Sequence, residues 1–438
     1  MNHKLINNIF NSGIEKIILL SSQFVITMIL IRTLGRESYG IIGIVTGYYA
    51  ILSILNLSIE PIILRDHKKY TDINKVIFNF EVFNIFKIVI LLIFSLILSY
   101  FLSKNFTNIN FLYSMGSIFI ITSLEILISP FVFYASSQYK QQLVTKITFI
   151  RVVLNLILAM GLFYIPTLEY IFYKDIVIFI IILYLWINIA YKELNIKFTT
   201  KLFSQIDINF IWKTIVNYSL WSHLTSISTN IIYKIDTVFL SFFVGLNEIG
   251  DYNIALNSAN VANILPGILG YQNKVALSHT KTEEEAYKIS NMFIRLSIYI
   301  GLFTFIIFYF FGDFYLYLIT GHENNENIYI YMMFIVTGLI ILKSFASGFT
   351  SFIVIKNNIK SLFIYITLPS LISALILYYI SASQFGVYGI AFSNILISLI
   401  WLVLLIVYLK KINYVFKEIL SFKKDIYFIK RKLYEIFF

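Results

Sequence analysis

The sequence lacks cysteine altogether and is poor in charge: 13% of its 438 residues are charged, whereas 59% are hydrophobic. The absence of cysteine excludes disulfides, thiolate chemistry and Cys-ligated metal sites. A typical soluble domain is about 25% charged, so a soluble core of this size would leave much apolar surface in water. We therefore predict an all-α polytopic membrane protein whose surplus apolar surface faces lipid.

Apolar runs of about 20 residues recur along the whole chain, and each is long enough to cross about 30 Å of hydrocarbon. The first run is long and has no small-residue cleavage site, so we expect it to remain as a helix and not to be removed as a signal peptide. The pattern predicts about twelve spans, near residues 14–32, 40–62, 82–102, 112–134, 147–164, 171–191, 214–243, 250–271, 289–311, 328–355, 361–382 and 387–409.

The connections between these runs alternate in their content of lysine and arginine. Of the 34 Lys and Arg residues, 24 lie in the N-terminus, in alternate connections and in the C-terminal tail, and 3 lie in the remaining connections. Basic loops stay on the cytoplasmic side of a membrane, so both termini are expected in the cytoplasm. The same asymmetry accounts for the net charge of +11, and no nucleic-acid partner is predicted.

The two halves of the chain are similar to each other. Residues 11–55 align without gaps on 221–265, an offset of 210 positions, with 9 of 45 residues identical, including the pairs Gly35/Gly245 and Gly40/Gly250. Transporters are often built from two such repeats. We predict an N-lobe at 1–191, a cytoplasmic linker at 192–213, a C-lobe at 214–409 and a basic amphipathic cytoplasmic tail at 410–438.

Two segments resemble the polysaccharide flippases: TLGRESYGIIGI at 33–44 and YKIDTVFLSFFVGLNEIGDYNIA at 233–255. The chain is similar, over nearly its whole length, to Wzx-type O-antigen flippases of the multidrug/oligosaccharidyl-lipid/polysaccharide exporter superfamily. The resemblance implies a MATE-like fold, with two pseudo-symmetric six-helix lobes around a central cavity. It also implies a bacterial inner-membrane protein that moves an undecaprenyl-diphosphate-linked oligosaccharide from the cytoplasmic to the periplasmic leaflet, beside other polysaccharide-assembly proteins. Peptidoglycan-precursor flippases of this superfamily have fourteen helices, whereas this chain has room for about twelve, which argues against that branch.

Seven cations fall inside the predicted spans, where each costs about 2.5–3.5 kcal/mol on insertion scales. Four lie near predicted helix ends and are expected to reach the interface, namely Lys16, Lys87, Arg151 and Lys174. Lys234 and Lys343 lie well inside their spans, and Arg295 is intermediate. A diphosphate needs fixed cations, and the predicted ligands are Lys234, Lys343, Arg295 and Lys87.

Polar residues follow helical spacing on the predicted seventh and eighth helices. His223, Asn230 and Lys234 share one face of the seventh helix, and Asn253, Asn257 and Asn260 share one face of the eighth. Amide groups both donate and accept hydrogen bonds, as sugar hydroxyls do. We predict that these side chains line the cavity and contact the saccharide; the alternative is that they join neighbouring helices.

Two acids inside spans, Asp236 and Glu125, are candidates for H⁺ or Na⁺ coupling, or else neutralise a nearby lysine. No cofactor and no enzymatic activity are predicted, because no metal, nucleotide or nucleophile motif is present. The alternative functions are a small-molecule or drug antiporter of the same superfamily and a membrane polysaccharide polymerase. A drug antiporter is expected to have a more apolar or acidic cavity, and a polymerase a larger outer loop.

The basic asymmetry predicts that Asn108 and Asn325 lie on the outer side of the membrane. Single cysteines introduced there, into a chain that has none of its own, should react with an impermeant thiol reagent in intact cells. Reaction that occurs only after lysis would contradict the predicted topology.

Overall fold

The computed structural model describes residues 3–60, 62–63, 70, 72–106, 108–138, 140–198, 200–216, 220–278, 280–321 and 326–416, and within these ranges it contains helices and no strands. Contacts divide the chain into two compact units. The first comprises Met1–Ser241, Gly245–Gly250 and Leu318–Gly321, and the second Phe242–Val244, Asp251–Tyr317 and His322–Phe438. The predicted lobes, with their boundary in the 192–213 linker, stay a prediction.

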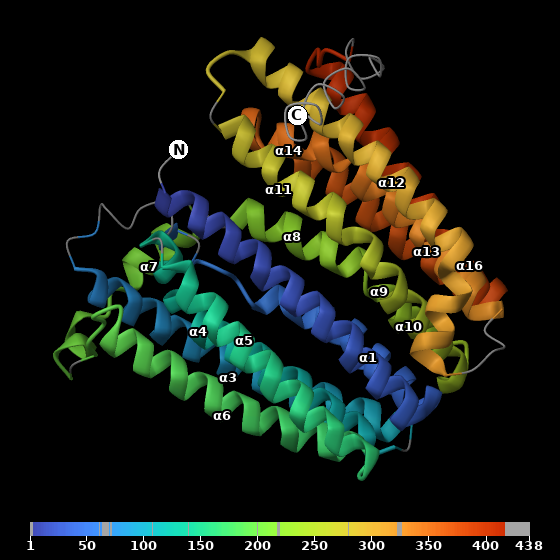
Figure 1. Ribbon diagram of the computed structural model, residues 1–438, viewed down its shortest axis with the longest axis horizontal. Helices are drawn as coiled ribbons and strands as arrows, with labels where there is room; N and C mark the ends of the chain where they lie inside the picture. Colours follow the sequence, from blue (N-terminus) through green and yellow to red (C-terminus); the bar gives the residue numbers. More distant parts are fainter. Residues whose placement is uncertain are drawn as a thin grey trace, which may run out of the picture. The chain divides into compact units, whose positions relative to one another are not determined.

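The first unit is a bundle in which α3, α4, α5 and α6 lie side by side (Figure 1). Side-chain caps define where several of these helices begin: Asp72 accepts from the amides of Asn74 and Lys75, and Thr167 accepts from the amide of Tyr170. The helices of this unit are α1 (His3–Leu52), α3 (Ile73–Asn105), α4 (Asn110–Ser137), α5 (Gln141–Met160), α6 (Leu168–Lys192), α7 (Ile208–Thr214), α8 (Leu220–Ile232) and α9 (Ile235–Leu240), with the short turns η1 (Ser53–Leu55), η3 (Gly161–Phe163) and η4 (Thr200–Gln205).

The segment between α6 and α8 packs against the first unit. Ile196 and Ile211 belong to the same buried cluster as Phe80 and Trp186. Asn79, which is 1% exposed, donates to the Gln205 carbonyl and accepts from the Asp207 amide at 2.7 Å. This segment, predicted as a linker, is therefore part of the core of the first unit.

The second unit contains two π-helical segments, η7 (Ile341–Phe345) and η8 (Phe363–Thr367). The helix α10 (Leu246–Ala259) begins in the first unit and continues in the second. The other elements are η6 (Asn260–Asn263), α11 (Ile264–Ser278), α12 (Glu283–Thr320), α13 (Glu326–Ile340), α14 (Ser347–Lys356), α15 (Ile359–Leu362) and α16 (Leu368–Lys411).

The chain that follows α16 is held by an aromatic contact in the second unit. Tyr414 donates to Asn291 Oδ1 at 2.8 Å and packs edge-to-face on Tyr287 and Phe352. Burial raises the pKa of the Tyr414 hydroxyl, so it remains a hydrogen-bond donor at physiological pH. Most of the predicted amphipathic tail, residues 417–438, lies outside the described residues.

Eight helical stretches in the described part of the chain are long and apolar enough to cross a membrane. Two of them, Ser21–Leu55 and Ile359–Lys411, each contain a glycine with positive φ, Gly35 at 76° and Gly386 at 57°. An unbroken α1 of 50 residues would measure about 75 Å, far more than a bilayer core, and the break at Gly35 divides it into two arms. The predicted seventh and eighth spans are each divided into shorter helices.

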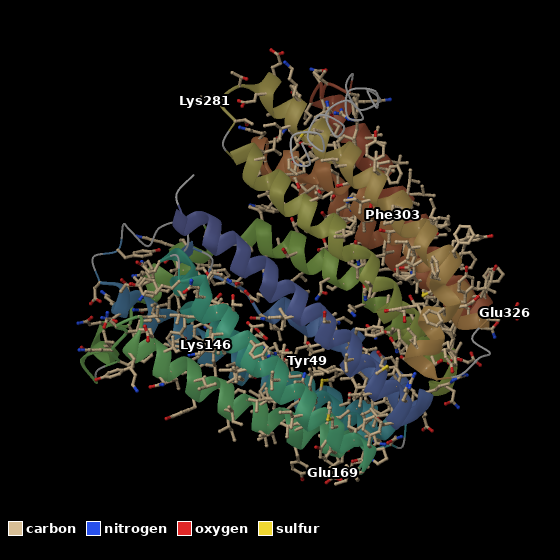
Figure 2. The ribbon with its side chains drawn as sticks, in the orientation of Figure 1. Tyr49, Lys146, Glu169, Lys281, Phe303 and Glu326 are labelled. Atoms are coloured by element: carbon tan, nitrogen blue, oxygen red, sulfur yellow. The ribbon has the colours of Figure 1, made fainter. Side chains whose placement is uncertain are left out.

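Large apolar side chains cover the surfaces of the long helices. On α3, Ile93 and Ile97 are 51% and 61% exposed, and on α12 the value for Phe303 is 61% (Figure 2). Water would disfavour this much apolar surface, and lipid would not. The prediction of a polytopic helical membrane protein is confirmed.

A buried polar network joins α4, α5 and α6. The ammonium of Lys174 lies 2.7 Å from both Asp175 Oδ1 and Asn155 Oδ1, and Ser117 donates to Asp175. Lys174 and Asp175 are 7% and 3% exposed. The expectation that Lys174 reaches the interface is wrong, because a carboxylate and an amide satisfy its charge inside the bundle.

Substituting Asp175 by alanine should lower the free energy of unfolding by about 3–5 kcal/mol, because it leaves the Lys174 ammonium buried without its ionic partner. Asp175→Asn, which keeps an acceptor for Ser117, should cost less. Thermal unfolding in detergent measures both. Glu284→Ala, which breaks the exposed Lys288–Glu284 pair, is the matched control and should unfold as the parent protein does. Equal unfolding temperatures for Asp175→Ala and Glu284→Ala would refute the role of the network.

Candidate functional site

A cavity of about 330 Å³ lies in the first unit, where the chain leaves α1 and meets α3 and α4. Polar groups from all three segments face it. Its lining residues are Asn56, Ser58, Glu60, Lys87, Glu125, Ile126, Ile128, Ser129, Val132 and Phe133.

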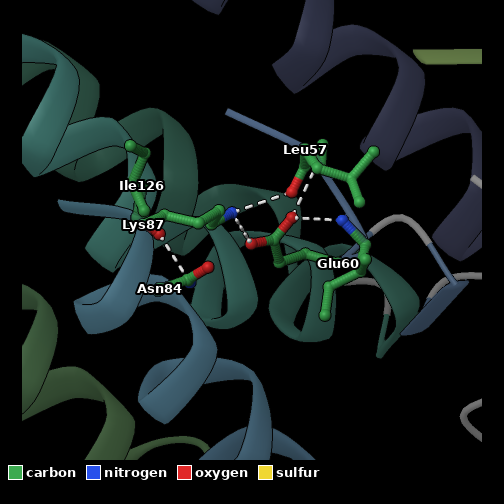
Figure 3. Close-up of polar contacts among 7 residues, drawn as sticks. Leu57, Glu60, Asn84, Lys87 and Ile126 are labelled. Carbon is green, nitrogen blue, oxygen red and sulfur yellow. Dashed lines mark hydrogen bonds and ion pairs between the residues drawn. The ribbon is translucent and has the colours of Figure 1, made fainter. Parts of the chain in front are cut away.

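An ion pair between Lys87 and Glu60 forms one wall of this cavity (Figure 3). The Lys87 ammonium lies 3.1 Å from Glu60 Oε1 and donates to the Leu57 carbonyl at 3.0 Å. The second oxygen of Glu60 accepts from the Ser58 hydroxyl and the Ile59 amide, both at 2.9 Å. The side chains are only 3% and 1% exposed. Lys87 therefore does not extend to the interface as expected, because the irregular segment after α1 supplies acceptors inside the bundle.

Two further acceptors lie on the same face of α3 as Lys87. Glu81, Asn84 and Lys87 are spaced three residues apart, which places them along one side of the helix. Asn84 donates to the Ile126 carbonyl at 2.9 Å (Figure 3), whereas its Oδ1 and Glu81 Oε1 are buried without a hydrogen-bond partner among the described residues. Sequence analysis assigns Glu81 and Asn84 no role, although the three-residue spacing is the signal that identifies them.

A second ion pair extends the polar surface of the cavity. Glu125 lines the cavity from α4 and pairs with Arg151 of α5, and the two side chains are 53% and 28% exposed. Arg151 was expected to snorkel, and its partner is instead a carboxylate on the neighbouring helix. Glu125 is accessible to a ligand or an ion, and its proposed part in ion coupling stays a prediction.

The predicted polar face of the seventh helix contacts the end of α1. His223 Nε2 lies 3.2 Å from the Ile54 carbonyl oxygen, and Asn230 Nδ2 donates to the Ser53 hydroxyl at 3.5 Å. Two of the predicted saccharide contacts, His223 and Asn230, therefore lie beside the C-terminal end of α1, a few residues before Glu60 in the chain.

Lys234 occupies a break in the predicted seventh helix, between α8 and α9. Its φ and ψ are −129° and −17°, and its carbonyl accepts from the Thr237 hydroxyl at 2.9 Å. Asp236 is fully buried, and one of its oxygens accepts from the Thr237 amide at 2.7 Å. Both residues belong to the first unit. The sequence pattern predicts one continuous helix here, and the structure replaces it with two.

The remaining predicted ligands belong to the second unit. Arg295 of α12 is 5% exposed, and Lys343 lies in the π-helical segment η7, a kind of irregularity that is frequent at functional sites. Asn253 and Asn257 lie on α10, but Asn260 lies in the following turn, where its Oδ1 accepts from Asn263. The predicted asparagine face therefore ends at Asn257.

Comparisons with known proteins identify the fold. No family model and no curated protein sequence matches the chain. Among solved structures, an inward-facing multidrug resistance MATE family transporter of the MOP superfamily matches 93% of this chain and 99% of its own, with a TM-score of 0.65 at 13% identity. The lipid II flippase MurJ in an inward closed conformation matches 92% of this chain and 87% of its own, with a TM-score of 0.61 at 16% identity.

A mutant of the Vibrio cholerae MATE transporter VcmN also matches, over 93% of this chain and 97% of its own, with a TM-score of 0.55 at 12% identity. The chain therefore has the fold that these multi-pass membrane transporters share. The proteins it resembles in structure are transporters and a flippase, and not enzymes.

Proposed function

We propose that the protein is a flippase for a lipid-linked anionic saccharide, and specifically that it moves an undecaprenyl-diphosphate-linked oligosaccharide, such as an O-antigen unit, from the cytoplasmic to the periplasmic leaflet. The observation that carries the proposal is the polar cavity of the first unit. Six of its ten lining residues are polar, and its lysine is buried in the membrane-spanning part of the chain. The fold shared with MurJ, a lipid II flippase, supports a lipid-linked cargo.

The cavity chemistry suits a saccharide that carries phosphate. Asn56, Ser58 and Ser129 offer amide and hydroxyl groups that both donate and accept, as sugar hydroxyls do. Lys87 offers a charged hydrogen-bond donor, but in the structure it is paired with Glu60. A phosphate that binds Lys87 therefore competes with Glu60, which keeps the attraction moderate and allows release on the far side. Lys234, Lys343 and Arg295 stay diphosphate ligands predicted from the sequence.

A small-molecule or drug antiporter is the second candidate, and one observation favours it. Glu60 and the half-exposed Glu125 bring two acids to the cavity wall, where a cationic drug would find partners. The MATE family transporter with the same fold is described as a multidrug resistance protein. The same acids also suit a cycle in which H⁺ or Na⁺ exchanges for cargo, and Glu125 and Asp236 remain our proposed coupling residues.

Removing the cavity lysine should slow flipping. Lys87→Gln alone leaves Glu60 buried and unpaired, at a cost of about 3–5 kcal/mol, so the informative variant is the double substitution Glu60→Gln/Lys87→Gln. We expect it to fold and to flip at least about tenfold more slowly, since one charge-assisted hydrogen bond contributes more than 1.4 kcal/mol. The measurements are complementation of a flippase-deficient strain and flipping of a lipid-diphosphate saccharide in proteoliposomes.

The matched control is Asp175→Asn, which alters a buried polar network away from the cavity lining and should retain flipping. Wild-type flipping by the double variant would defeat the proposal, and uptake of a cationic dye by the parent protein would then favour the antiporter.

In the same assay Lys234→Ala/Lys343→Ala should be inactive, whereas replacement of each lysine by arginine should preserve much of the activity.

Ion coupling predicts that an imposed gradient changes the rate of flipping. In proteoliposomes of the parent protein, a pH or Na⁺ gradient should accelerate flipping, and the acceleration should be lost in Asp236→Asn or Glu125→Gln. If the rate of flipping is the same with and without either gradient, coupling through these acids is ruled out, and the proposed cargo is not affected.

A further inference from the structure

Residues 327–417 carry charge of one sign only. This stretch contains six lysines and no aspartate, glutamate or arginine, so a carboxylate partner for these lysines cannot come from within it. Four of the six are exposed and lie in two segments that the basic asymmetry places on the cytoplasmic side, namely Lys356, Lys360, Lys410 and Lys411. An anion that neutralises them therefore comes from another element or from outside the protein.

The two arms of α16 form an antiparallel hairpin. The chain reverses near Gly386, whose φ is 57°. The hydroxyls of Ser381 and Ser393 lie 2.6 Å apart, and Tyr378 donates to Asn394 Oδ1 at 3.2 Å. Both pairs are nearly symmetric in sequence about Gly386, so the arms lie side by side. The segment η8, which precedes the first arm, therefore lies beside the last turns of the second.

An aromatic cluster joins the two ends of this hairpin. Tyr365 of η8 stacks on Tyr408 of α16, with ring centroids 5.6 Å apart and planes at 22°. The Lys411 ammonium lies 4.6 Å from the centre of the Tyr365 ring, which is a cation–π contact. Tyr408 donates to Asn357 Oδ1 at 3.4 Å, in the connection that contains Lys360. Lys411 is thus held against a ring while its side chain remains exposed.

Each arm of α16 also presents exposed apolar residues, spaced four apart, that lead to this cluster. They are Leu399, Val403 and Val407 on the second arm and Leu368, Ile372 and Ile376 on the first. Lys410 and Lys411 continue the strip of the second arm, three and four residues after its last member. From Leu399 to Lys411 the helix rises about 18 Å, slightly more than half of a hydrocarbon core of about 30 Å.

We propose that this cluster binds the headgroup of an anionic glycerophospholipid of the cytoplasmic leaflet, with Lys410 and Lys411 on the phosphate and the apolar strips against the acyl chains. An apolar strip that ends in fixed positive charge is complementary to an amphiphile with a negative headgroup, whereas a soluble anion would contact the lysines alone. Lysine binds phosphate as a point charge, and tyrosine is favoured where hydrocarbon meets water. The proposal rests on the membrane class and the predicted orientation, and not on the proposed cargo.

The first experiment compares two lipids that differ only in headgroup. Purified full-length protein in detergent is titrated with dioleoylphosphatidylglycerol or dioleoylphosphatidylcholine, and bound lipid is measured by native mass spectrometry. The parent protein should bind phosphatidylglycerol at least about fivefold more tightly, and Lys410→Gln/Lys411→Gln should weaken that binding by about fivefold for each lysine removed. Lys288→Gln, which removes an exposed lysine of α12 in the same unit, is the matched control and should bind as the parent does.

The second experiment tests the ring that holds Lys411. Tyr365→Leu keeps both charges and an apolar side chain but removes the cation–π contact, and should weaken phosphatidylglycerol binding by about two- to fivefold. Tyr365→Phe keeps the ring and should restore parental binding. Both substitutions are at a half-exposed side chain, and thermal unfolding checks that each variant is folded.

Several outcomes would overturn the site. These are equal binding of the two lipids by the parent, an unchanged preference in Lys410→Gln/Lys411→Gln, and an equal loss in Lys288→Gln. Competition by soluble glycerol phosphate at the same concentration as the lipid would indicate a site for free phosphate instead. Displacement by undecaprenyl phosphate, together with loss of flipping in the double variant, would assign the cluster to the cargo. Because both experiments measure binding of a membrane lipid, a wrong cargo assignment would leave their results intact.

Discussion

The cost of charge inside a bilayer is the constraint on which the first unit depends. Lys87, Arg151 and Lys174, the cations that fall inside the predicted spans of its α3–α6 bundle, each have a carboxylate partner. The two most buried pairs, Lys87–Glu60 and Lys174–Asp175, also have neutral hydrogen-bond partners. An ion pair without such partners would not recover its desolvation cost, so the positions of α3, α4, α5 and α6 are tied to these contacts as well as to apolar packing.

The same constraint shapes the candidate site. In the proposed flippase, Glu60 already pairs with Lys87, so an anion that binds this lysine must compete with Glu60. Two acceptors on α3, on Glu81 and Asn84, have no hydrogen-bond partner among the described residues. In the Lys174 network, by contrast, the ammonium has two partners at 2.7 Å.

The first unit also contains close backbone contacts at glycine residues. Large side chains fix the helices of the first unit, and Gly40 and Gly250 let backbone segments from opposite halves of the sequence approach each other closely. His223 and Asn230 contact the residues that follow α1, beside the segment that continues to Glu60.

The sequence by itself determined the membrane class and the two glycine pairs, because hydropathy and repeats are local properties. It did not determine the partners of its charges. Lys87, Arg151 and Lys174 resemble interfacial lysines and arginines when read along one helix, and Glu60, Glu125 and Asp175 were not assigned to them. The break at Lys234 was also hidden within an apolar run. Only the tertiary structure decided these points, because whether a charge snorkels or pairs depends on which carboxylates and neutral acceptors the fold brings within about 3 Å of it.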